Sequence, residues 1–240
     1  MDLKIDLYAD LVCPWCYIGK RWLDAALQGL GEGLSVGITW RPFELNPDLP
    51  PGGIGRASYR AAKLGVGAEQ LAAMDARIQA VAQAEDLPLD LARIERVPNT
   101  FNAHRLIWLA RQEDVQNEMV DALFHGYFAS GKDLGDRMVL AEIAADVGLN
   151  GDMVELFLDT AEGIMEVRAE ESLGLGLGIS AVPCLVVNGV HQILGARSPR
   201  VLRETLMSLI WSERRERALG EEVSPRSAGL DDMPGDQAGL

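Results

Sequence analysis

Two short stretches near the N-terminus alternate apolar and polar residues, and a helical pattern lies between them. Residues 3–7 and 34–40 both repeat with a period of two, which predicts half-buried strands. From Pro14 onward the apolar residues fall on one helical face. Proline suits the first helical position because its missing N–H would be unpaired there anyway. The N-terminal pattern therefore predicts a strand, a helix and a second strand.

The middle of the chain has a different pattern. After a loop over residues 46–56, helical spacing runs almost throughout residues 57–160 and predicts a helical block with no clear strand. Beyond a further helix, the run V-P-C-L-V-V predicts a short buried strand, and Asn188-Gly189 is a strong hairpin signal. Residues 190–194 predict the partner strand, and a last helix begins near proline 199.

With the helical block set aside, the element order is β-α-β followed by α-β-β-α. These elements predict one mixed four-stranded sheet with helices on both faces, in the α/β class. The arrangement is similar to the thioredoxin fold with a large all-helical insertion. We expect a thioredoxin-like domain built from residues 1–54 and 163–215, an insertion subdomain over residues 55–162, and a flexible polar tail over residues 216–240.

Composition and charge narrow the function classes. The 240 residues are 48% hydrophobic and 24% charged, and no apolar run approaches the length of a membrane helix. The formal net charge of -14 argues against nucleic acid or an anionic membrane surface as a partner. The N-terminal residues lack the basic start and apolar core of a secretory signal. We therefore expect a cytoplasmic protein.

The chemistry of the chain concentrates in the C-P-W-C motif. Cys13 and Cys16 are two of only three cysteines, and they lie where the first strand turns into the first helix. A helix N-terminus stabilises a thiolate through its unpaired N–H groups and the macrodipole. Cys16 lies one turn further on, close enough to attack a mixed disulfide on Cys13. The spacing therefore predicts one attacking and one resolving thiol, with Pro14 and Trp15 between them.

The cysteine pair could also belong to a zinc site or simply pack in the core. A zinc site needs two more ligands, and the chain offers only Cys184 and three histidines without ligand spacing. Two inert buried cysteines would not need a proline and a tryptophan at a helix start. The redox interpretation is favoured over both, and we predict no metal site.

Five motifs occur in order along the chain: C-P-W-C-Y-I-G-K, R-P-F-E-L-N-P, N-T-F-N-A-H-R-L, A-V-P-C-L-V-V-N-G and L-G-A-R-S-P. Together they resemble the FrnE-type branch of the DsbA-like thioredoxin superfamily, over about residues 3–212. The superfamily also contains 2-hydroxychromene-2-carboxylate isomerases and kappa-class glutathione transferases, which usually carry a serine in place of Cys13 and lack the second cysteine.

The resemblance implies roles for particular residues. Cys13 matches the nucleophile and Cys16 the resolving thiol, while Pro14 and Trp15 would tune the redox potential. The family's proline loop, in which the X-Pro bond is cis, corresponds to Val182 and Pro183. Further substrate-binding residues are implied beside and above the active site: Phe43, Asn46, Asn99, Thr100 and His104.

Cys184 departs from the family pattern, as does Ala181 before the Val-Pro pair. A third redox thiol or a metal ligand is conceivable at Cys184. Strand alternation is expected to turn its side chain away from the face that Val182 presents, and a small buried cysteine is common. We therefore expect a packing role.

The sequence supports a thiol-disulfide oxidoreductase that needs no cofactor beyond its own disulfide. Protein or small-molecule thiols and disulfides are the expected partners, with glutathione as a candidate co-substrate, and the chain is a monomer or homodimer. One alternative is a glutathione-dependent isomerase or transferase. A second is a non-catalytic metal-binding or partner-binding module. The sequence leaves open the substrate, the direction of electron flow and the electron partner.

Overall fold

The computed structural model describes residues 2–30 and 34–222. The chain divides into two compact units, Met1–Arg203 and Glu204–Leu240. Within the described residues, the first unit contains all six strands and the helices α1 to α8, together with the first residues of α9 (Pro199–Glu222). No helix in these described ranges is long and apolar enough to cross a membrane.

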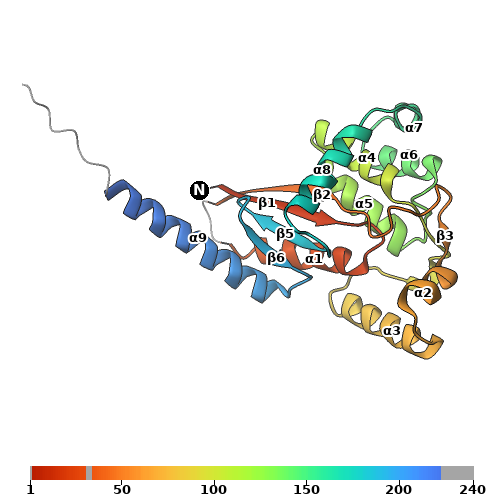
Figure 1. The fold of residues 1–240 in the computed structure, drawn as a ribbon, viewed down its shortest axis with the longest axis horizontal. Coiled ribbons are helices and arrows are strands. Elements are labelled where there is room, and N and C mark those ends of the chain that lie inside the picture. The colour runs from red at the N-terminus through yellow and green to blue at the C-terminus, as the bar shows by residue number, and fades with distance from the viewer. Residues whose placement is uncertain (1, 31–33, 223–240) are drawn as a thin grey trace, which may run out of the picture. The chain divides into compact units, whose positions relative to one another are not determined.

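The central sheet is mixed and four-stranded, with the order β2-β1-β5-β6. β1 (Asp2–Ala9) pairs parallel with β2 (Ser35–Pro42) and antiparallel with β5 (Cys184–Val187). β5 pairs antiparallel with β6 (His191–Leu194) across the Asn188-Gly189 turn. Strands from the two ends of the chain therefore meet in one sheet, as Figure 1 shows. This is the predicted thioredoxin-like arrangement.

The first helix, α1 (Pro14–Leu27), links β1 to β2, and all other helices of the first unit precede β5 except the start of α9. The region between β2 and β5 also contains a single 3-10 turn, Leu91–Arg93. Its helices are α2 (Arg56–Leu64), α3 (Ala68–Ala84), α4 (Phe101–Gln112), α5 (Gln116–Phe128), α6 (Arg137–Asp146), α7 (Gly151–Asp159) and α8 (Ile164–Gly176).

The inserted block is not free of strands, which corrects one expectation. β3 (Ile54–Gly55) and β4 (Arg96–Val97) form a two-residue antiparallel pair that closes the segment containing α2 and α3. Two residues are too few to leave an alternating pattern in the sequence. The division into a domain, an insertion subdomain and a tail stays a prediction. α9 continues as a helix to Glu222, through the first residues of the predicted tail, and residues 223–240 lie outside the described ranges.

Side chains of α5 hold the insertion against the sheet and against α1. Tyr17 of α1 stacks on Phe124 and Phe128 of α5, with ring centroids 5.3 and 5.5 Å apart. The Gln116 side chain accepts a hydrogen bond from the Trp40 backbone N–H at 3.0 Å and donates to its carbonyl at 3.2 Å. Buried amide groups require such partners. The insertion therefore holds one side of α1, the helix that begins within the C-P-W-C motif.

Candidate active site

Cys13 occupies the N-cap of α1, with Pro14 in the first turn as predicted. Its backbone N–H donates to the Asp10 carbonyl at 3.1 Å, and its carbonyl accepts from the Cys16 N–H at 3.0 Å. The side chain makes no capping hydrogen bond, so the sulfur is available for chemistry at the positive end of the helix. Its Sγ lies 3.9 Å from the Val182 carbonyl oxygen, which brings together two sites that the sequence separates by 169 residues.

The two thiols of the motif differ in access. Cys13 is 6% exposed and lines a pocket, whereas Cys16 is fully buried. Burial, and next the hydrogen bond with Cys13, raise the pKa of the Cys16 thiol well above its usual value. Both cysteines are free thiols in this structure. Of the two thiols, only Cys13 therefore lies where a molecule in the pocket is able to contact it.

A fully buried carboxyl, Asp10, lies beside the pair. Its Oδ2 accepts the Leu45 N–H at 2.7 Å, its Oδ1 accepts the Val12 N–H at 3.4 Å, and the Thr100 side chain is a further hydrogen-bond partner. Burial outweighs these hydrogen bonds and raises the pKa of Asp10 to about 6. The backbone of Asp10 hydrogen-bonds Cys16, and its carboxylate is close enough to raise the pKa of that thiol.

A buried histidine, His104, also lies beside Asp10. Its Nε2 lies 3.8 Å from Asp10 Oδ1 and has no hydrogen-bond partner in the part of the chain that the structure describes. Burial lowers the pKa of His104 to about 4, although a hydrogen bond to the Phe43 backbone opposes this. The imidazole is therefore neutral near pH 7, so this pair is a carboxylate beside a neutral ring and not an ion pair.

The Val182-Pro183 loop packs against α1, and its peptide bond is cis. A Cβ added to Gly19 of α1 would lie 3.2 Å from Pro183 Cγ, so a side chain there would require the proline ring to shift by a few tenths of an ångström. The Pro183 carbonyl accepts the Gly195 N–H at 2.8 Å. The loop is thus fixed between α1 and the end of β6.

None of the predicted substrate-binding residues, Val182 and Pro183 included, lines the pocket beside Cys13. Thr100 and His104 are buried at Asp10, and Phe43 packs, as Val182 does, against a buried cluster that contains Cys184. Asn99 donates to the Leu49 carbonyl at 3.0 Å and accepts the Phe101 N–H at the start of α4. Asn46 accepts hydrogen bonds from Tyr59 and Lys63. Asn46 and Asn99 therefore tie the loop over residues 43–49 to the helices around it.

The pocket beside Cys13 has a volume of about 250 Å³. Cys13, Pro14 and Trp15 form one wall, and α2, α3, the segment around β4 and α5 form the others. No side chain of these other walls is assigned to the site from the sequence, although the spacing of Arg56, Arg60 and Lys63 places three cations on one face of a helix. Asp10 was also missed, because one carboxyl after a strand looks like an ordinary solvated residue.

Cys184 is fully buried in a cluster with Tyr8, Ile179 and Val186, against which Val182 and Phe43 also pack. The expectation that its side chain turns away from the face of Val182 is therefore wrong. Residues two apart in an extended chain share a face, so alternation places Cys184 on the same side as Val182. Burial raises the pKa of the Cys184 thiol. Within the described ranges, no group of three or more histidine, cysteine or acidic side chains is arranged to hold a metal.

A second buried acidic cluster joins the loop after β2 to α8. Arg168 Nη1 donates to Glu44 Oε2 at 2.6 Å and to Glu171 Oε2 at 2.7 Å. The Oε1 atoms of both glutamates are buried without any other partner among the described residues. Burial and the neighbouring Glu171 raise the pKa of Glu44 to about 7, against the lowering effect of Arg168. A proton shared between the two carboxyls would satisfy both orphaned oxygens.

Glu44→Gln is expected to stabilise the fold above pH 7. The folded-state pKa of Glu44 is raised, so its protonated form supports the fold below the ordinary pKa of 4.5, and this support is lost as pH rises through about 7. A glutamine amide replaces the shared proton permanently. At pH 8.5 we expect a gain on the order of 1 to 3 kcal/mol in the free energy of unfolding, and none at pH 4. Denaturant unfolding at both pH values measures it, with the exposed Glu166→Gln as control. Equal changes at both pH values would contradict the shared proton.

The mixed sheet, the C-P-W-C motif at the start of α1 and the cis-proline loop facing it define a thioredoxin-like domain of the kind that carries out disulfide exchange. Residues 4–207 match the family described as DSBA-like thioredoxin domain, and the chain belongs to that family.

Known relatives agree with this assignment. The uncharacterized protein YwbO of Bacillus subtilis is 26% identical over 211 residues, which are 86% of this chain and 96% of the relative. The 2-hydroxychromene-2-carboxylate isomerase of Sphingobium xenophagum is 25% identical over 188 residues, 78% of this chain and 90% of the isomerase. The crystal structure of a probable DsbA oxidoreductase from Streptomyces coelicolor has a TM-score of 0.79 and 28% identity, and the match covers 97% of this chain and all of that one.

Proposed function

We propose that this protein is a FrnE-type thiol-disulfide oxidoreductase of the cytoplasm, working through Cys13 and Cys16. One observation carries the proposal: the Cys13 sulfur, which lines the pocket at a helix N-terminus, lies beside a fully buried second thiol and faces the Val182 carbonyl at 3.9 Å. Protein or small-molecule disulfides and thiols are the substrates, with glutathione as a candidate co-substrate. The family to which the chain belongs supports the reaction class.

The exchange proceeds in two steps. The Cys13 thiolate attacks one sulfur of a substrate disulfide, so that a Cys13-substrate disulfide forms and the other substrate sulfur leaves as a thiolate. Cys16 then transfers its proton to the Asp10 carboxylate and attacks Cys13 Sγ, which releases the second substrate thiolate. Two electrons pass from the dithiol to the substrate. Two molecules of a thiol such as glutathione then reduce the Cys13-Cys16 disulfide in two exchanges and leave as their own disulfide, and the reverse of the first sequence oxidises a substrate dithiol.

The surroundings of each group fit its step. The Cys13 sulfur lies at the N-terminus of α1, where the positive end of the helix dipole favours an anion. The Val182 backbone lies at the edge where an extended substrate segment is able to pair beside Cys13. Asp10 is mostly ionised near pH 7 because its pKa is about 6, so it is able to accept a proton. Pro14 and Trp15 lie between the sulfurs and tune how well the reduced form is stabilised.

A redox titration of the cysteine pair in glutathione buffers tests the proposal. We expect one reversible two-electron transition, read by thiol labelling and by the fluorescence of Trp15, and its loss in Cys13→Ser. A potential of about -120 mV, like that of DsbA, would indicate an oxidant. A potential of about -270 mV, like that of thioredoxin, would indicate a reductant. If no disulfide forms and glutathione binds without being consumed, the proposal fails. The likeness to a 2-hydroxychromene-2-carboxylate isomerase would then favour a glutathione-dependent isomerase or transferase.

A further inference from the structure

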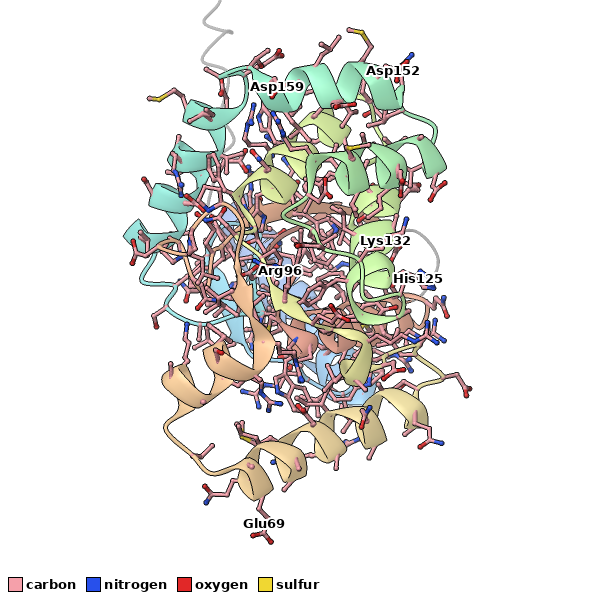
Figure 2. All side chains as sticks on the ribbon, turned by 90° about the vertical axis from the view of Figure 1, so that its right-hand side faces the viewer. Glu69, Arg96, His125, Lys132, Asp152 and Asp159 are labelled. Atoms are coloured by element: carbon pink, nitrogen blue, oxygen red, sulfur yellow. The ribbon has the colours of Figure 1, made fainter. Side chains whose placement is uncertain are left out.

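The pocket beside Cys13 has one strongly cationic wall. Arg56, Arg60 and Lys63 project from α2, and Asp75 of α3 is the one carboxylate that lines the pocket within the described ranges. α2 and α3 lie side by side in both Figure 1 and Figure 2. The wall therefore carries two excess positive charges in a chain whose formal net charge is -14. Such a local reversal of sign attracts anions to the place where it occurs.

The hydrogen bonds of these cations position them without cancelling their charge. Arg56 Nη2 donates to both oxygens of Asp75, at 3.1 and 3.0 Å, and Arg60 donates to the same carboxylate. Lys63 Nζ donates to the Leu45 carbonyl at 2.8 Å and to the Asn46 side chain, both of which are neutral acceptors. One aspartate thus balances one of three cations.

The facing surface of the same pocket is apolar. It is built by side chains from α3, the 3-10 turn, the segment around β4, and α5. These side chains include Met74, Ile78, Leu91, Ile94, Val97 and Phe128. A mostly apolar cavity with a few converging charged groups is the usual form of a small-molecule site.

We propose that this pocket binds the apolar, carboxylate-bearing half of a small disulfide or thiol and presents its sulfur to Cys13. The inference rests on the proposed function and specifies its substrate class. The carboxylate meets the face of α2 that carries Arg56, Arg60 and Lys63, the apolar body lies against Ile78 and Phe128, and the sulfur reaches Cys13. A volume of about 250 Å³ suits one aromatic or branched acid better than a folded protein segment.

Three disulfides separate charge from reactivity. 5,5′-Dithiobis(2-nitrobenzoic acid) is aromatic and anionic, 4,4′-dithiodipyridine is aromatic and uncharged near pH 7, and dithiodiglycolic acid is anionic without a ring. The rate constant of Cys13 with each probe is measured in the Cys16→Ser background at low ionic strength, then divided by the rate constant of free cysteine with that probe. This ratio removes the intrinsic reactivity of the disulfide. We expect the aromatic anion to give the highest ratio.

Lys63→Gln is the diagnostic variant, because Lys63 is exposed and its loss leaves the Arg56–Asp75–Arg60 bonds intact. We expect it to lower the ratio for the aromatic anion about tenfold and that for dithiodipyridine less than about twofold. Lys132→Gln is the matched control, since Lys132, labelled in Figure 2, pairs with Glu142 and does not line the pocket. It should change neither ratio.

The outcomes are distinguishable. Equal loss for both aromatic probes would show that Lys63 acts on the Cys13 thiolate and not on the ligand, which overturns the inference and leaves the proposed function standing. An unchanged ratio for the anion overturns it as well. An acidic peptide disulfide is measured as a fourth probe. If its ratio is higher than that of the aromatic anion and depends on Lys63 in the same way, the ligand of the pocket is a peptide, which overturns the proposed small molecule. No reaction of Cys13 with any probe contradicts the proposed function itself.

Discussion

Replacing Cys13 with serine is expected to abolish disulfide exchange, with a loss of at least about 10³-fold in turnover. Cys13 is the sulfur that lines the pocket and faces Val182, and a serine hydroxyl is neither ionised near pH 7 nor able to form a disulfide. Thiol release from a disulfide substrate with a thiol reductant in excess measures the effect. Normal turnover by this variant would show that another group performs the first attack.

Cys184→Ala is the matched control for that experiment. It removes the third thiol of the chain from a buried cluster beside β1 and β5 that does not line the pocket. We expect turnover within about twofold of the wild type, together with a loss of stability on the order of 1 kcal/mol from the lost packing. A large loss of turnover in this variant, with its fold intact, would indicate a third redox thiol.

Asp10→Asn is expected to slow the second step about 10²-fold while the first step keeps its rate. The asparagine occupies the same volume but does not accept the Cys16 proton. In the wild type, resolution should accelerate as pH rises through about 6, where Asp10 ionises, and the variant should lose this rise. Single-turnover mixing with a disulfide substrate, quenched by acid, separates formation of the mixed disulfide from its resolution. Asp48→Asn, on the exposed part of the neighbouring loop, is the control for charge.

The stability of the Asp10→Asn variant distinguishes loss of a proton acceptor from damage to the fold. The folded-state pKa of Asp10 is raised from 3.8 to about 6, so the protonated form supports the fold below about pH 4 and this support is lost as pH rises through 6. At pH 8 the variant should be more stable than the wild type, by on the order of 1 to 3 kcal/mol, and slower at the same time. A variant that is both slower and less stable at pH 8 would contradict the role given to Asp10.

Local patterns in the sequence predicted the parts of the fold that local physics determines. The alternation in β1 and β2, the proline at the start of α1 and the Asn-Gly turn between β5 and β6 each depend on neighbouring residues, so one chain is enough to read them. The β3–β4 pair was not predicted, because a strand of two residues is too short to show an alternation of apolar and polar positions. Its two strands also lie about 40 residues apart in sequence.

Within the site, only the residues that belong to a recognisable sequence motif could be predicted. The C-P-W-C spacing led directly to Cys13 and Cys16, and the V-P run led to the loop that the structure places against them. Asp10 gains its character from burial and from the loop at Leu45, neither of which is visible in a sequence. The cations of α2 look like an ordinary solvated helix face until α3 and the segment around β4 are seen to enclose them. Asp10 and the cations of α2 were therefore missed because their roles depend on which distant segments surround them in the fold, and a sequence pattern does not show this.

The two-cysteine mechanism is tested most directly by locating the substrate sulfur on the protein. The Cys16→Ser variant is allowed to react with a disulfide substrate, and the trapped adduct is mapped by mass spectrometry of peptides prepared without reduction. We expect a stable adduct on Cys13 alone, because the buried thiol that would release it is missing. An adduct on Cys184, or turnover by this variant as fast as the wild type, would contradict the mechanism.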